Sequence, residues 1–433
     1  MSQFNFNDVI EWGALNETER EEILRRPAVM AGDRIKTVVE GILEAVRERG
    51  DEALREFSAK FDRTEVKDFR VSAEEVDAAV ARLPEDFMAA LKTAAANIEK
   101  FHSAEVLEPV TVETMPGVVC QQVTRPIGAV GLYIPGGTAP LFSTVLMLGI
   151  PAKIAGCGRV ILCSPPPIAD PILAAARLCG IDEIYQVGGA QAVAAMAFGT
   201  ATIPRVGKIF GPGNAYVTEA KRQVSSRPDG AAIDMPAGPS EVLVIADEGA
   251  DPAFVAADLL SQAEHDMLAS AILLTDDITL AEQVQQELEK QCSQLPKAQI
   301  ASKSLMDWGA IVVVPNIMTA VAIANRVAPE HLELCVRDPW ALLPHIRHAG
   351  AIFMGQHSPE PVGDYFAGPN HVLPTLRTAR FSSALSVQNF CKKTSIVATS
   401  PAFLLENAPA IASLARLEGL EAHARSVEIR SKR

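Results

Sequence analysis

The chain has 433 residues, of which 48% are hydrophobic and only 5% aromatic, so its aliphatic side chains can fill roughly two to four separate cores. Its 39 basic and 53 acidic residues give a formal net charge of −14, and no lysine- and arginine-rich run offsets it. This balance argues against nucleic acid and anionic membranes as partners, and the longest apolar stretch, residues 141–152, is too short to span a bilayer.

The first 110 residues are predicted to be helical. Residues 1–27 are polar, lack the basic and apolar regions of a secretory signal, and end at Pro27, so we expect an N-terminal arm that lies on another surface. Farther along, apolar residues recur at helical spacing, which predicts helices over residues 35–50, 52–61 and 73–83.

From residue 118 onward, short β-branched runs alternate with alanine-rich stretches. Strands are predicted at 129–134, 159–163, 183–187 and 207–210, and helices at 141–155, 171–179, 190–198 and 215–224. The alternation resumes after Pro239, with strands at 242–245, 271–274, 311–314, 332–336 and 351–354, and a helix at 252–264 among those between them. Two such runs predict an α/β fold with two parallel sheets, followed by a terminal helical unit at 403–405, 408–417 and 420–427.

Histidines with acidic and amide neighbours concentrate in the C-terminal half. Gln262 and His265 are three residues apart near a predicted helix end, which places both side chains on one face. With Asp364 and His423 they would offer two imidazoles, a carboxylate and an amide oxygen, a set that suits Zn²⁺. The same spacing is also compatible with two residues that merely cap a helix.

A second candidate group is the pair Glu330-His331, which follows Ala328-Pro329. Proline favours an extended preceding residue, so the pair is expected where a loop enters a strand. A carboxylate beside an imidazole can move protons near neutral pH. A surface ion pair is at least as compatible with these two residues alone.

Glycine-rich turns occur at Gly136-Gly137, Gly188-Gly189 and 211–214. The last of these follows a predicted strand and precedes a helix, which is the geometry that binds phosphate at a helix N-terminus. None matches the dinucleotide fingerprint, because Tyr216 stands where the third glycine belongs. Each glycine pair is equally explained as a tight turn.

These residues lie within long segments that resemble the histidinol dehydrogenase family. The resemblance extends from about residue 28 to about residue 430, and its most specific segments are GDEALREFSAKFD (50–62), 121–157, 188–195, 208–224, 233–247, SQAEHD (261–266), PEHLEL (329–334) and GDYFAGPNHVLPT (363–375). It implies two NAD-dependent oxidations of L-histidinol, through bound L-histidinal to L-histidine, at the end of histidine biosynthesis in the cytoplasm.

The resemblance also implies a role for each matching residue. It implies an acid/base pair of Glu330 and His331 and one Zn²⁺ per subunit held by Gln262, His265, Asp364 and His423. The implied substrate contacts are Ser240, Gln262, His265, His331, Asp364, His371, Glu418 and His423, and the implied NAD contacts are Tyr133, Gln191 and Asn214.

The family pattern further implies an intertwined homodimer of two α/β domains with incomplete Rossmann-like sheets. We expect an N-terminal arm at 1–27, a main domain from 28–133 and 240–384, an NAD-side domain at 134–239, and a C-terminal arm at 385–433 that reaches the partner's site.

Other functions remain open at this level. A metal-assisted hydrolase would use the same ligands without a nucleotide, and a binding or assembly protein would keep the fold without chemistry. Within a dehydrogenase, Cys120 or Cys157 would be needed for a covalent thiohemiacetal route, but neither has an adjacent basic or histidine residue in the sequence that would lower its pKa. We therefore expect reduced, unreactive thiols and attack by water.

Overall fold

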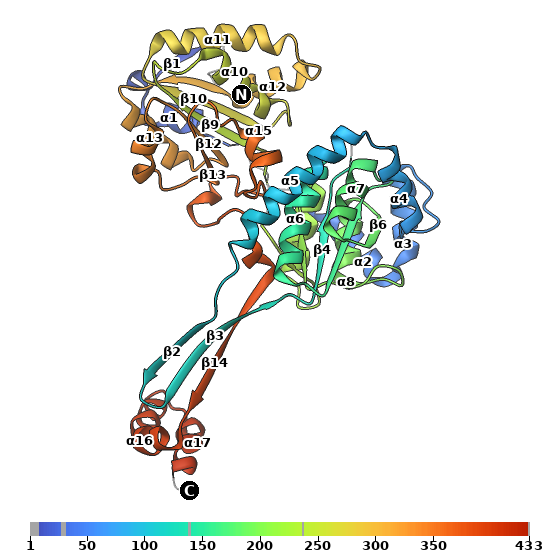
Figure 1. Ribbon diagram of the computed structural model, residues 1–433, viewed down its shortest axis with the longest axis vertical. Coiled ribbons are helices and arrows are strands. Elements are labelled where there is room, and N and C mark those ends of the chain that lie inside the picture. Colours follow the sequence, from blue (N-terminus) through green and yellow to red (C-terminus); the bar gives the residue numbers. More distant parts are fainter. Residues whose placement is uncertain (1–7, 27–31, 137–139, 236–237, 432–433) are drawn as a thin grey trace.

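The computed structural model describes residues 8–26, 32–136, 140–235 and 238–431. Within them, two parallel sheets form separate α/β units, and a long arm extends away from both (Figure 1). The expectation of an α/β fold with two parallel sheets is confirmed. No helix in these ranges is long and apolar enough to cross a membrane.

The larger sheet has six strands in the order β1-β11-β10-β9-β12-β13, and every neighbouring pair is parallel. All residues of β9, β10 and β12 are buried, because helices cover both faces of the sheet. The bounds are β1 Val9–Glu11, β9 Glu241–Ala246, β10 Ser270–Thr275, β11 Ala310–Val313, β12 His331–Cys335 and β13 Ala351–Met354. The helices of this unit are α1 Glu17–Ile23, α10 Pro252–Ala263, α11 Ile278–Cys292, α12 Ala298–Trp308, α13 Ile317–Val327, α14 Pro339–Leu342 and α15 Glu360–Val362.

The smaller sheet has five parallel strands in the order β6-β5-β4-β7-β8. They are β4 Ala129–Tyr133, β5 Arg159–Ser164, β6 Glu183–Gln186, β7 Lys208–Phe210 and β8 Ala232–Ile233. One face is covered by α2 Asp33–Arg49, α3 Asp51–Phe57, α8 Gly189–Phe198 and α9 Ala215–Ser225. The other face is covered by α4 Ala73–Arg82, α5 Glu85–Ser103, α6 Phe142–Ala155 and α7 Asp170–Cys179.

The packing of the N-terminal half differs from the expected division of the chain. Helices α2–α5 were grouped with residues 240–384, but their buried faces pack on the five-stranded sheet, and β4 lies at its centre. Residues 9–26, expected as an arm, instead add the edge strand β1 and the helix α1 to the six-stranded sheet. The hydrophobic pattern of an amphipathic helix predicts which of its faces is buried, but it does not predict the sheet against which that face packs.

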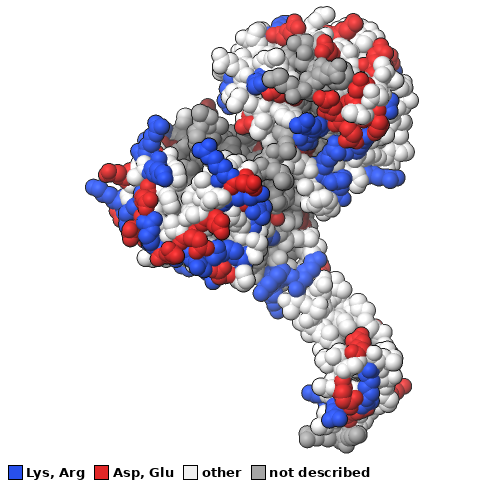
Figure 2. Space-filling model, turned by 180° about the vertical axis from the view of Figure 1, so that it is seen from behind, with Lys and Arg blue, Asp and Glu red and all other residues white. Residues whose placement is uncertain are grey.

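The long arm consists of three antiparallel strands that end in two helices. Strands β2 Val110–Met115, β3 Val118–Pro126 and β14 Cys391–Thr399 form the shaft, and α16 Pro401–Leu417 and α17 Glu421–Ser431 lie at its far end (Figure 1). On the face shown in Figure 2, the shaft carries few charged side chains, whereas acidic and basic residues mix over the two α/β units. The C-terminal helices were expected, but these three strands were not.

Candidate active site

A cleft lies where the two α/β units meet, and six of the twelve predicted site residues line it. Its cavity of about 170 Å³ adjoins a second one of about 350 Å³, and both are lined by Ser240 and His265. The first is lined by Leu141, Ser143 and Thr144 of the five-stranded unit, by Pro212, and by Gly238, Ser240, His265, Glu330, His331, Glu360, Asp364, Tyr365, His371, Val372, Leu373 and Thr375. A cleft shared by two sheet units is a common place for a small-molecule site.

Glu330 and His331 lie where a loop enters β12, as the sequence predicts. Ala328 ends α13 in the left-handed conformation, with φ of 49°, and not in the extended one expected before a proline, and β12 begins at His331. The backbone N–H of Glu241 donates to Glu330 Oε2 at 2.9 Å, and His331 Nδ1 lies 3.0 Å from the carbonyl oxygen of the same residue. A carbonyl can only accept, so Nδ1 carries the proton and Nε2 is the free acceptor of the neutral ring.

The Nε2 atom of His331 lies near the carboxyl groups of two residues that line the cleft, Glu360 and Asp364. It is buried and has no hydrogen-bond partner among the described residues. Carboxylate oxygens of Glu360 and Asp364 lie 3.9 Å from it, too far for a hydrogen bond and close enough to stabilise a positive charge. This geometry leaves the ring ready to accept a proton and suits an imidazolium that forms only transiently.

Burial shifts the pKa of each member of the pair so that its neutral form is favoured. Loss of water around the ring lowers the pKa of His331 to about 4, so the ring is neutral at neutral pH. Burial raises the pKa of Glu330 well above its usual value, and the nearby carboxylates of Glu241, Glu360 and Asp364 raise it further. A carboxyl that holds its proton more tightly is a stronger base once ionised.

Donors for a metal ion converge beside this pair. Ligand atoms of His265, Glu360 and Asp364 all lie within 4.8 Å of one another. Gln262, in the last turn of α10, is fully buried, and neither atom of its amide has a partner among the described residues. An unpaired buried amide is costly, and a cation would satisfy its oxygen, so these residues fit a divalent metal.

His265 is placed differently from the prediction. It was expected on the same helical face as Gln262, but α10 ends at Ala263 and His265 lies in the turn that follows, with its backbone N–H donating to Gln262 O at 3.2 Å. The ring opens onto the cleft, yet the protein around its other sides removes enough water to lower its pKa. A neutral ring is the form that binds a metal.

Sequence reasoning missed Glu360, which lines the cleft and lies beside both His265 and Asp364. It is buried, its Oε2 has no partner in the described part of the chain, and burial raises its pKa well above the usual value. The available signal was its spacing of four residues from Asp364, which places both side chains on one face of a helical turn. These turns are α15 and the π-helical turn Gly363–Ala367.

His371 links the two α/β units across the cleft. Its Nδ1 lies 2.9 Å from the carbonyl oxygen of Asp364, and its Nε2 lies 3.3 Å from Thr144 Oγ1 on α6. Because the carbonyl accepts, Nδ1 is the protonated nitrogen and Nε2 can accept from the threonine hydroxyl. The bond across the cleft fixes how α6 sits against the loop that carries Asp364.

Two of the predicted site residues lie on the arm, away from this cleft, within one chain. Glu418 caps the end of α16 and His423 lies in the first turn of α17, both of them exposed at the far end of the arm (Figure 1). Neither is among the residues that line the cleft.

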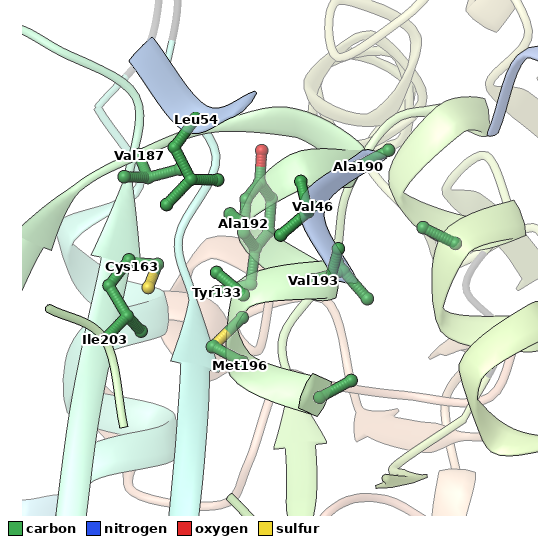
Figure 3. Close-up of a cluster of buried hydrophobic side chains, with 14 of the residues drawn as sticks. Val46, Leu54, Tyr133, Cys163, Val187, Ala190, Ala192, Val193, Met196 and Ile203 are labelled. Atoms are coloured by element: carbon green, nitrogen blue, oxygen red, sulfur yellow. The ribbon is translucent and has the colours of Figure 1, made fainter. Parts of the chain in front are cut away.

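The three predicted NAD contacts lie at the glycine turns of the five-stranded sheet. Tyr133 is buried among aliphatic side chains (Figure 3), and its hydroxyl accepts from the N–H of Gly189, where α8 begins. Gln191 is buried one turn into α8, and its Nε2 has no partner within the described ranges. Asn214 caps α9 by accepting from Tyr216 N and Val217 N.

The glycine turn at 211–214 joins a strand to a helix, as predicted. It connects β7 to α9, and Gly211 has φ of 113°. A Cβ there would come within 2.0 Å of the Tyr133 carbonyl oxygen, so only glycine fits. The conformation of this turn is therefore fixed by its close packing against the end of β4.

No cysteine among the described residues lines the cleft. Burial raises the pKa of Cys157 to about 11, which leaves it a thiol at neutral pH, and Cys120 lies on the arm strand β3. The expectation that these thiols are unreactive agrees with their places in the fold.

Fold and site together define an α/β protein with an acid/base pair, metal-type donors and glycine turns around one interdomain cleft, the class to which metal-assisted dehydrogenases belong. Comparison with known proteins identifies the particular family. The family model for histidinol dehydrogenase matches residues 25–431. The chain is 54% identical to the histidinol dehydrogenases of Yersinia pestis, over 99% of this chain and 97% of that protein, and of Salmonella typhimurium, over 98% of each.

A solved structure agrees with the sequence relatives. The crystal structure of histidinol dehydrogenase from Elizabethkingia anophelis superposes with a TM-score of 0.94 at 43% identity, covering 99% of both chains. The chain belongs to the histidinol dehydrogenase family, and with that membership it is an oxidoreductase, an L-histidinol dehydrogenase of histidine biosynthesis. The hydrolase and the non-catalytic alternatives are thereby set aside.

Proposed function

We propose that the interdomain cleft is the active site, and that it binds L-histidinol and NAD and carries out two successive oxidations, through bound L-histidinal to L-histidine, in the cytoplasm. The observation that carries this proposal is the pairing of Glu330 and His331 on one backbone residue, with both side chains lining the cleft. Two phases of oxidation need two proton acceptors, and adjacent residues supply both at one carbon atom.

In the first phase His331 takes the hydroxyl proton of histidinol. Its Nε2 is the unprotonated nitrogen, because Nδ1 donates to the Glu241 carbonyl oxygen. The imidazolium that results lies 3.9 Å from the carboxylates of Glu360 and Asp364, which offset its charge. NAD, when bound, accepts the hydride that leaves the same carbon.

In the second phase Glu330 removes a proton from the water that attacks the aldehyde. Its carboxyl is fixed by the N–H of Glu241, and its raised pKa makes the ionised form a strong base. As the water adds, the imidazolium of His331 gives its proton to the aldehyde oxygen, and the neutral ring then deprotonates the hydrate for the second hydride transfer. This division of labour explains why the two residues are neighbours.

Gln262, His265 and Asp364 would hold one Zn²⁺, with His423 of a second copy as the fourth ligand. The fit rests on the unpaired buried amide of Gln262 and on the closeness of His265 to Asp364. When bound, the ion would orient the amino alcohol by chelating its imidazole and amine nitrogens. Ser240 and His371 line the same cavity and would contact the substrate beside these ligands.

The N-termini of α8 and α9 would receive the phosphates of NAD. The dipole of a helix favours anions at its N-terminus, and both helices open at glycine turns. Gln191 and Asn214 would contact the cofactor directly. Tyr133, which is only 3% exposed, would act through the position of Gly189.

A second copy of the chain would complete the site with Glu418 and His423. The arm is unusually exposed for an apolar structure, since Val112, Val397 and Leu417 are 48%, 68% and 83% exposed. Such a surface calls for a partner, and an exchanged arm would carry Glu418 to the substrate amine and His423 to the metal. We therefore propose an intertwined homodimer.

Spectroscopy at the NADH wavelength tests the activity. The purified protein with L-histidinol and excess NAD should form two NADH per histidinol consumed. A flat trace after incubation with Zn²⁺ would overturn the proposal. One NADH per histidinol, with aldehyde accumulating, would overturn the second phase alone.

Subunit complementation tests the shared site. His265→Asn and His423→Asn variants should each be inactive, but mixed dimers carry one site with an intact cleft and an intact arm. Random pairing would then restore about a quarter of the wild-type sites, since half of the dimers are mixed. No recovery in mixed dimers that are shown to form would contradict an exchanged arm.

A further inference from the structure

Both members of the acid/base pair depend on a single residue, Glu241, at the start of β9. Its N–H holds the Glu330 carboxylate at 2.9 Å, and its carbonyl oxygen accepts from His331 Nδ1 at 3.0 Å. These bonds set the tautomer of the imidazole and the direction of the carboxylate. A small displacement of this one peptide would therefore misplace both groups at once.

The side chain of Glu241 is anchored in turn by two other segments. Its Oε1 accepts from the N–H of Leu376 at 2.8 Å, and its Oε2 lies 3.6 Å from Nε of Arg26. The side chains of Arg26 and Glu241 are only 6% and 2% exposed. Burying two charges costs several kcal/mol unless they are paired, so removal of either partner would leave the other as an uncompensated buried charge.

The loop on the far side of Glu241 is held in an unfavourable conformation. Leu376 and Arg377 both have positive φ, 53° and 64°, a region that residues other than glycine rarely adopt. Such strain persists only where surrounding contacts impose it, and it is frequent near functional sites. The same loop begins at His371 and includes Thr375, whose hydroxyl accepts from Gly238 N at 2.7 Å and which lines the cleft.

We propose that the buried ion pair of Arg26 and Glu241 is a positioning device that aligns the acid/base pair for catalysis. It ties the N-terminal segment and the 371–377 loop to the one peptide that holds Glu330 and His331. Arg26 and Glu241 are positioning residues, since neither side chain lines the cleft. This inference rests on the proposed roles of Glu330 and His331.

The alternative is that the pair only stabilises the fold. The two roles differ in what they change. A stabilising contact lowers the melting temperature but leaves the turnover number of the folded protein intact. Loss of a positioning contact misplaces Glu330 and His331. It therefore lowers kcat, and it shifts the pH profile of kcat because the surroundings of these two titrating groups change.

The test compares Arg26→Gln, Glu241→Gln and the double variant with the wild type, all as full-length protein well below their melting temperatures. Glutamine at 241 keeps an oxygen for the Leu376 N–H but removes the charge. We expect each single variant to lose about tenfold or more in kcat while KM for histidinol changes less than about twofold. The pH profile of kcat should shift in each.

The double variant separates the two roles, because it leaves no lone charge in the interior. Its melting temperature should recover toward the wild type while kcat stays low. Arg26→Lys keeps the charge and should restore part of kcat. If the double variant has wild-type kcat and pH profile, or if both single variants are merely less stable, the positioning role is wrong.

Arg377→Gln is a matched control. Arg377 donates to the Leu24 carbonyl at 3.0 Å and lies 3.8 Å from Glu21, so it ties the same two segments without touching Glu241. This variant should keep wild-type kcat. Equal losses of kcat in Arg377→Gln and Arg26→Gln would overturn the proposal, because segment docking in general would then be responsible.

Failure of the positioning inference can be distinguished from failure of the proposed roles of Glu330 and His331. If Glu330→Gln and His331→Asn retain full activity, the assigned roles of those residues fail whatever happens at Arg26. If they are impaired while Arg26→Gln is not, only the positioning inference fails.

Discussion

Replacement of Glu330 by glutamine separates the two oxidations. The side chains have nearly the same shape, and glutamine can still accept from the Glu241 N–H that holds Glu330 Oε2 at 2.9 Å. What glutamine cannot do is take a proton from water. The first oxidation relies on His331, so it should proceed at close to the wild-type rate, and the second should be slowed.

The size of the loss follows from the role. A positioned general base contributes about 10²–10⁴-fold to a rate, which is the slowing expected for histidinal oxidation. The same substitution should not lower the stability of the fold, although it lowers the rate. The pKa of Glu330 is raised in the fold from an unfolded value of about 4.3, so the folded state binds more protons and loses stability as pH rises above that value. Glutamine does not titrate, so the variant should be at least as stable as the wild type at pH 8.

The assay follows NADH with histidinol and, separately, with histidinal as the substrate, together with urea unfolding at pH 5 and pH 8. Glu333→Gln is the matched control, since Glu333 lies three residues further on in β12, is buried and has a raised pKa, but does not line the cleft. It should keep both oxidations. Equal slowing of the two steps in Glu330→Gln would refute the division of labour, and a destabilised variant would refute the account of its pKa.

Three further outcomes test the site and its surroundings. His265→Asn should lose bound zinc and activity together, and metal content unchanged after dialysis would reject this residue as a ligand. Burial raises the pKa of Asp258, beside Glu333, from 3.8 to about 6, so the folded protein should lose up to about 3 kcal/mol of stability as pH rises from about 4 through 6. Asp258→Asn should flatten that decline in urea unfolding at pH 4 and pH 7, and an unchanged slope would contradict the shift. Cys120→Ser and Cys157→Ser should both retain aldehyde oxidation, and its loss in either would favour the covalent route.

The two parallel sheets could be predicted because buried strands and covering helices leave distinct patterns. The run 241–246 is entirely aliphatic after its first residue, and α10 begins with an aspartate cap and a proline. Strand and helix positions therefore agree with the structure to within about two residues in these runs. The order of strands could not be predicted, because it depends on which buried surfaces meet.

The arm could not be predicted for a related reason. Strand β14 pairs with β3 across more than 250 residues of sequence, from Cys391–Thr399 to Val118–Pro126, and the residues of β14 beyond the first are all exposed. A strand that buries little in its own chain carries no alternating pattern. The proposed second copy of the chain would explain the exposed apolar residues of this strand.

Some residues of the candidate site could be predicted from the sequence and others could not. The difference is whether a residue acts through its side chain or through its backbone. His265, Glu330, His331, Asp364 and His371 act through side chains, so their chemistry can be read from residue types and matching segments, and the cleft contains all five. Glu241 acts on the pair through its backbone N–H and carbonyl oxygen, which every residue other than proline supplies. Only the buried partner of its side chain singles it out, and that contact joins residues 26 and 241, which no local pattern connects. A residue that positions a site through its backbone can therefore be found only from the structure. Because Arg26 pairs with the side chain of Glu241, substitution of Arg26 tests this role without changing the backbone groups of Glu241.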